Sequence, residues 1–173
     1  MTDASDRPRM TPADDPSWEH YADTILELFA DRSLELDLGE AVPPDALERL
    51  DEQGVGPTFA VLTACNPYGR VMDDLWNRRL TQVLRAEVAT GGRAWVPADG
   101  VSRDGAHREV GVAVSMPKAE ARLLACRFGQ SAFFWFDGTS MWIIGAVVES
   151  TDQKLPIENN TRSSVPDAQS SSP

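Results

Sequence analysis

The residues with the clearest chemical potential lie in one short polar turn, NPYGR. The Asn66 amide and the Arg70 guanidinium are directional hydrogen-bonding groups, and Tyr68 adds a phenol. A helix that begins after the turn offers free backbone N–H groups, which favour an anion. Asp73 and Asp74 stand at that same helix end and would repel an anion. The turn is therefore a candidate ligand-binding site that suits a neutral ligand better than a phosphate.

Two further polar residues extend the candidate site. Arg78 lies in the helix that follows the turn, and Gln130 follows the end of a later helix. Gly129 supplies the geometry that ends this later helix, so Gln130 is free to bridge to the Asn66 loop. The alternative is structural, because Asn, Pro and Gly are ordinary turn residues and a glutamine amide can satisfy loose carbonyl groups. Both interpretations stay open.

The sequence has no pattern typical of a metal site or of a phosphate-binding loop. The two Cys and two His residues do not have metal-ligand spacing, and neither standard phosphate-binding glycine loop is present. We therefore expect no metal and no cofactor. Cys65 ends a strand and Cys126 lies on an apolar helix face, so we expect both to be reduced, buried thiols.

A buried strand must deliver the turn, and a long helix must follow it. The run TFAVLTAC is almost continuously apolar, as in strands buried on both faces, which are usually parallel. Asp73 and Asp74 begin a helix that extends to about Thr90, with apolar residues at helical spacing. A hairpin over 93–115, a helix over 118–128 and an aromatic hairpin over 131–148 come next.

The remaining elements define the expected fold class. Residues 18–30 show helical spacing, 33–38 alternate as a strand, and a short helix follows Pro44. We predict an α/β (α+β) fold with a single mixed β-sheet and helices packed on it. From the second strand the order is ferredoxin-like β-α-β-β-α-β, with an added strand at each end. The predicted divisions are a disordered acidic arm (1–16), one domain (17–149) and a disordered polar tail (150–173).

Charge limits the expected partners. The net charge is −11, and residues 1–57 carry 15 acidic and 4 basic side chains, whereas residues 58–148 carry 8 and 10. Nucleic acid is not expected, because binding it requires an excess of cations. The longest apolar run, 141–148, is far shorter than the ~20 residues of a membrane span. With no secretory signal at the start, we expect a cytoplasmic protein.

Several segments resemble a bacterial family catalogued as domain of unknown function 3293. They are TACNPYGR, the pair Asn77-Arg78 and ARLLACRFGQSAFFW, and the resemblance extends over about 21–148. This chain has Cys65 and Ser131 where the family often has an aromatic residue and an amide. It has Ala-His-Arg-Glu at 106–109 where the family usually has a Trp-Pro-Glu-Glu-like stretch. The resemblance implies a small cytoplasmic α/β domain and no assigned activity.

Two functions fit these patterns. The first is a non-catalytic binding or regulatory protein, since no catalytic constellation is present. Its contact surface would be the aromatic hairpin, which carries more large rings than one face can hide: Phe133, Phe134, Trp135, Phe136 and Trp142. A protein partner or self-association would use this hairpin. The alternative is a small-molecule-binding enzyme that uses the Asn66–Arg70 turn together with Gln130.

Overall fold

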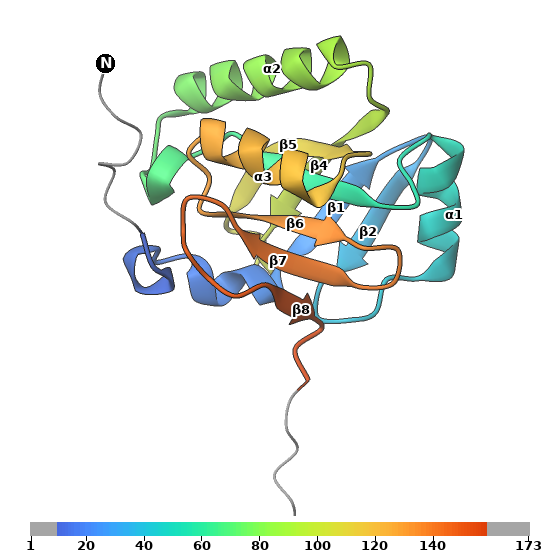
Figure 1. Cartoon of the computed structure of the whole chain (residues 1–173), viewed down its shortest axis with the longest axis horizontal. Helices are drawn as coiled ribbons and strands as arrows, with labels where there is room; N and C mark the ends of the chain where they lie inside the picture. Colours follow the sequence, from blue (N-terminus) through green and yellow to red (C-terminus); the bar gives the residue numbers. More distant parts are fainter. Residues whose placement is uncertain (1–9, 159–173) are drawn as a thin grey trace, which may run out of the picture.

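In the part of the chain that the structure describes, eight β-strands form a single sheet, and three α-helices pack against it (Figure 1). The computed structural model describes residues 10–158. The strands are β1 (Ile25–Phe29), β2 (Ser33–Asp37), β3 (Phe59–Thr63), β4 (Trp95–Val101), β5 (Arg108–Val114), β6 (Ala132–Phe136), β7 (Met141–Gly145) and β8 (Gln153–Leu155). The helices are α1 (Pro44–Glu52), α2 (Asp74–Thr90) and α3 (Lys118–Arg127), with short 3₁₀ helices η2 (Pro12–Asp14), η3 (Trp18–Asp23) and η4 (Pro67–Gly69).

The α+β class and the single sheet are confirmed, but the predicted mixed sheet is wrong. The strand order is β2-β1-β4-β5-β3-β6-β7-β8, and each neighbouring pair of these strands is antiparallel. Helix α2 joins β3 to β4 and α3 joins β5 to β6, and each connection passes over one intervening strand. Strands joined by a helix are therefore not paired with each other. The ferredoxin-like order stays a prediction. It concerns the four strands β3, β4, β5 and β6, and the sheet has two further strands on each side of these four, β2 and β1 on one side and β7 and β8 on the other, where one was expected.

The predicted helix over 18–30 is wrong in its second half. Residues 18–23 form η3, and residues 25–29 form β1, which pairs with both β2 and β4. Leu26 and Leu28 are buried in the core, whereas Glu27 points to the other face. The spacing of apolar residues in this segment is compatible with a strand as well as with a helix. The segment forms a strand because its two neighbouring strands supply hydrogen bonds that an isolated segment lacks.

Strand β3 separates two hydrophobic cores. Phe59 and Val61 face one core with Leu residues of β1, β2 and α1, whereas Ala60 and Leu62 face a second core with α2 and α3. The strand is therefore buried on both faces, as its apolar run predicts. Its burial comes from helices on opposite sides of an antiparallel sheet rather than from parallel pairing, and Figure 1 shows α2 and α3 together on one side.

The aromatic hairpin of β6 and β7 does not form an exposed patch. Phe133 and Phe136 are buried, and the other three rings are half-buried. Phe134 packs edge-on against Tyr21 of η3, and the Trp142 indole donates to Asp137 at 2.7 Å. The fold therefore leaves only part of the predicted contact surface exposed, and its use by a protein partner or in self-association stays a prediction.

Parts of the expected disordered ends have defined structure. Strand β8 falls within 150–173, because Gln153–Leu155 add to the edge of β7. Met10 forms a bridge to Val148, and Asp15 is buried. Residues 1–9 and 159–173 lie outside the described residues, and the domain boundaries stay a prediction.

Candidate functional site

The turn between β3 and α2 has an unusual backbone. Asn66 and Tyr68 both adopt the left-handed conformation, with φ of 51° and 57°. Asparagine tolerates this region well, but a bulky residue such as tyrosine rarely occupies it. A residue in this region persists only where its surroundings hold it. The contacts of the turn must therefore stabilise Tyr68.

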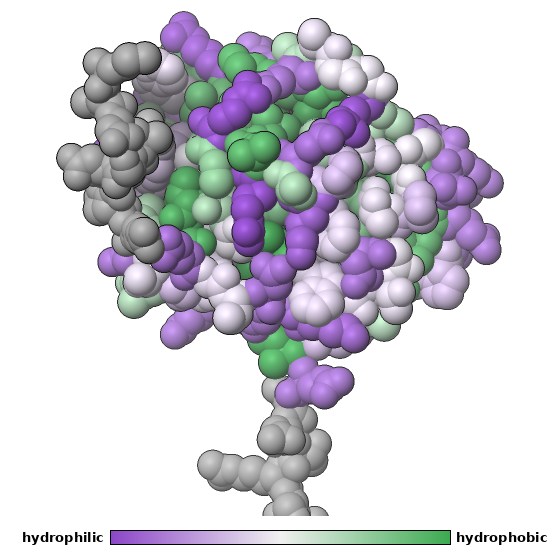
Figure 2. Space-filling model, in the orientation of Figure 1, coloured by the Kyte–Doolittle hydropathy of each residue, from purple (hydrophilic) through white to green (hydrophobic). Residues whose placement is uncertain are grey.

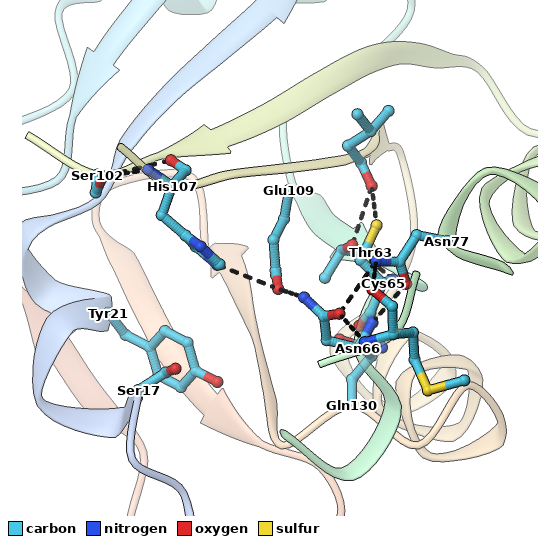
Figure 3. Close-up of polar contacts among 12 residues, drawn as sticks. Ser17, Tyr21, Thr63, Cys65, Asn66, Asn77, Ser102, His107, Glu109 and Gln130 are labelled. Carbon is cyan, nitrogen blue, oxygen red and sulfur yellow. Dashed lines mark hydrogen bonds and ion pairs between the residues drawn. The ribbon is translucent and has the colours of Figure 1, made fainter. Parts of the chain in front are cut away.

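The Asn66 side chain lies at the centre of a hydrogen-bond network (Figure 3). Its Oδ1 accepts from Met72 N at 3.0 Å and from Asn77 Nδ2 at 3.1 Å, while its Nδ2 donates to Glu109 Oε1 at 2.8 Å. Its backbone N–H donates to Asn77 Oδ1 at 3.0 Å. Since the amide oxygen and one amide proton are engaged, Asn66 primarily fixes the turn to α2 and β5.

Gln130 closes the turn from the opposite side. Its Nε2 donates to the carbonyl oxygens of Cys65 at 3.0 Å and Phe128 at 3.2 Å, and only 6% of the residue is exposed. Tyr68 N donates to Gly129 O at 2.6 Å, and the Tyr68 ring lies against Gly129. The two segments that carry the family resemblance are therefore in direct contact.

The two arginines of the candidate site do not join this network. Arg70 and Arg78 are exposed, and within residues 10–158 neither guanidinium has a hydrogen-bond or ion-pair partner. The structure thus brings Asn66, Tyr68 and Gln130 together and leaves Arg70 and Arg78 facing solvent.

Sequence reasoning missed a second group of polar residues beside the turn. Glu109 accepts from Asn66 and lies 3.7 Å from His107 Nε2. On the same side, the Tyr21 hydroxyl donates to Asp15 Oδ2 at 2.7 Å, and Asp15 is 4% exposed. Burial and this hydrogen bond raise the pKa of the Tyr21 phenol. Figure 3 shows His107 pointing toward Glu109, with the Tyr21 ring nearby.

A reactive thiol does not occur at this site. Cys65 is buried, and its Sγ lies 3.8 Å from Thr81 Oγ1 and 3.6 Å from Val110 O, with no cationic group among these contacts. Burial raises the pKa of the Cys126 thiol, which disfavours the nucleophilic thiolate. Within residues 10–158, no group of His, Cys, Asp and Glu is arranged to hold a metal ion.

Glu109 gave a weak signal in the sequence. It follows Asn66 by 43 residues, and only the pairing of β3 with β5 brings the two together. Asn77 was visible as part of a short motif, and its role follows from its place in the first turn of α2. The spacing of acids and amides along the chain does not reveal which of them will meet.

These features define an α+β protein whose β3–α2 turn is held by side chains from α2, from β5 and from the loop between α3 and β6. Residues 62–133 match the family model described as protein of unknown function (DUF3293), which confirms the predicted resemblance over that segment. The match includes Asn66, Asn77, Glu109 and Gln130, the residues that build the network. No curated protein and no solved structure matches the chain. No helix within residues 10–158 is long and apolar enough to cross a membrane.

Proposed function

We propose that this protein is a non-catalytic binding protein that contacts another protein through the surface around the start of α2. We define this turn surface by Tyr68, Arg70, Val71, Leu75 and Trp76. The observation that carries the proposal is their exposure. Val71 is 90% exposed, and the other three apolar members are also exposed. Four large apolar side chains exposed within nine residues favour a contact surface over an ordinary solvated loop.

The interior of the turn supports this function. The Asn66 and Gln130 amides are bonded to the protein itself, so they hold the turn rather than a ligand. A surface that is rigid before binding loses less conformational freedom when a partner binds. The left-handed Tyr68 fits this interpretation, because its backbone is held while its ring remains partly exposed.

The chemistry of the turn surface indicates the partner. Arg79 lies 5.9 Å from the Trp76 ring centroid, and Arg70 and Arg78 are exposed nearby in the sequence. Tryptophan, tyrosine and arginine are the residues most enriched at binding hot spots. Asp73 and Asp74 are exposed in the same stretch, so the surface carries both signs of charge. A protein that presents apolar side chains with both acids and bases around them would complement this combination.

A photo-crosslinking experiment tests the proposal. A photoreactive amino acid replaces Val71 in one variant and the exposed Glu35 of edge strand β2 in a control, and each full-length chain is irradiated in the cells that naturally produce it. We expect a discrete protein adduct from position 71 but not from position 35, and Trp76→Ala should weaken it. No adduct at position 71, or the same adducts at both positions, would refute the proposal.

One observation favours the alternative, a small-molecule-binding enzyme that uses the Asn66–Arg70 turn with Gln130. Glu109 links Asn66 to the exposed His107, so an acid and a base stand beside the turn. A thermal-shift screen with nucleotides and small carboxylic acids tests it, because a ligand at 100 times its dissociation constant adds about 2.7 kcal/mol of stability. A shift that Glu109→Gln abolishes would favour the enzyme over the binding protein.

A further inference from the structure

A separate groove lies between α2 and α3, away from the turn surface. It has a volume of ≈ 260 Å³ and a floor of buried apolar side chains, Val88, Met116 and Leu124. Figure 2 shows hydrophobic atoms, in green, gathered where Figure 1 places these two helices, with hydrophilic atoms beside them. We call this feature the helix groove.

One rim of the helix groove carries a protruding apolar side chain. Leu123 of α3 lines the groove and is 67% exposed. Burying a leucine contributes about 1.5–3 kcal/mol relative to leaving it in water. The groove and the protruding leucine thus lie side by side on one face. The same face therefore offers both an apolar cavity and an apolar side chain that can fill such a cavity.

The charges around the groove are balanced. Glu87 pairs with Arg127, and Glu120 pairs with Arg93, so each pair places one acid and one base at the groove. A partner of one strong charge gains nothing from such a rim. A copy of the same face, rotated by two-fold symmetry, can place its bases near these acids and its acids near these bases.

We infer that the helix groove is a self-association interface in which two copies of this chain pair through α2 and α3. In a two-fold dimer the same patch serves both copies, so Leu123 of each copy enters the groove of the other. Two copies that each carry a net charge of −11 repel one another over much of their surface. The neutral, apolar face between the helices is where that repulsion is smallest.

The size of the face limits the affinity. Helix α2 has 17 residues and is about 25 Å long, whereas α3 has 10 residues and is about 15 Å long. The whole outer faces of two helices about 10 Å wide would present roughly 400–500 Å² per copy. Only the end of α2 near Glu87 and Val88 borders the groove, so the interface is smaller than this and well below the ≈ 800 Å² per partner of a standard interface. The dimer should be weak, so the measurement must extend to high protein concentration.

Sedimentation velocity of the full chain from about 5 µM to about 500 µM tests the inference. We expect the mass to rise from 18.9 kDa toward twice that value. Leu123→Glu should keep the chain monomeric, because it places a like charge in both grooves. Leu75→Glu, at a residue 52% exposed on the turn surface, is the control and should leave dimerisation unchanged.

Three outcomes would overturn the inference. They are a monomer at every concentration, a dimer that survives Leu123→Glu, and a dimer that Leu75→Glu disrupts equally. Circular dichroism and urea unfolding of both variants confirm that each is folded. The test is independent of the proposed binding function, because Leu75 belongs to the turn surface and Leu123 does not.

Discussion

Gly129→Ala tests whether the Tyr68 ring and the Gly129 backbone hold each other in place. Gly129 has φ +65°, and a Cβ there would lie 2.8 Å from Tyr68 Cε2. Gly92 is a matched control, because its φ is +66° and a Cβ there would meet nothing within 4 Å. The two substitutions impose the same backbone conformation on alanine and differ in the ring contact.

The expected cost has two parts. The left-handed conformation costs a non-glycine residue about 1–2 kcal/mol, and this part is common to both variants. At Gly129 the Tyr68 ring must also move, and a side chain displaced by about 30° from its rotamer costs about 0.5–1.5 kcal/mol. We therefore expect Gly129→Ala to lower the free energy of unfolding by about 1 kcal/mol more than Gly92→Ala.

Urea unfolding measures this difference. With an m-value of about 2 kcal/mol/M, an excess of about 1 kcal/mol moves the midpoint by about 0.5 M. In a Tyr68→Ala background, where the ring is absent, the two glycine substitutions should have similar costs. Equal losses with Tyr68 present, or an excess that persists without the ring, would refute the reasoning.

Three further substitutions test other parts of the structure. Asn66→Ala removes three side-chain hydrogen bonds, so urea unfolding should show a loss of about 3 kcal/mol; a loss below about 1 kcal/mol would contradict the central role of this amide. Arg103 donates to Asp37 at 2.9 Å and lowers the pKa of that carboxyl. The contribution of this pair to stability is therefore present above the unfolded pKa of about 3.9 and is lost as the pH falls through the folded pKa. Arg103→Gln should flatten the acid limb of a plot of urea midpoint against pH, and an unchanged limb would count against the pair. The raised pKa of Tyr21 predicts a pH dependence of stability with the opposite sign. The stabilisation by Tyr21 is present below the unfolded pKa of about 10 and is lost as the pH rises beyond it. The difference in urea midpoint between the natural chain and Tyr21→Phe should therefore shrink above pH ~10, and a constant difference would exclude this linkage.

The elements with strong local signals were predictable. The helices expected over 73–90 and 118–128 are α2 and α3, and the apolar run that begins at Thr58 contains β3. In α2, Asp73 accepts from Trp76 N at 2.8 Å and caps the helix, while Leu84 and Val88 form its buried stripe. Caps, periodic apolar residues and glycine stops act within a few residues, so they can be recognised in the sequence.

Pairing between distant strands was not predictable to the same degree. The segment 25–29 has an alternation that also fits a helix, and only its position between β2 and β4 makes it a strand. The antiparallel sheet follows from helix connections that skip a strand, which depends on the order of all eight strands. Residues 153–155 form β8 because an exposed edge of β7 is available to them.

The sequence by itself determined that a buried strand ends in a polar turn before a long helix, and it identified Asn66, Tyr68 and Gln130 as residues of interest. Only the tertiary structure decided what they do. Glu109 is 43 residues from Asn66, and Gln130 is 65 residues from Cys65. Because these partners meet only through the packing of β5 and α3 around β3, the amides turn inward to hold the chain. The exposed side chains beside them remain available to another molecule.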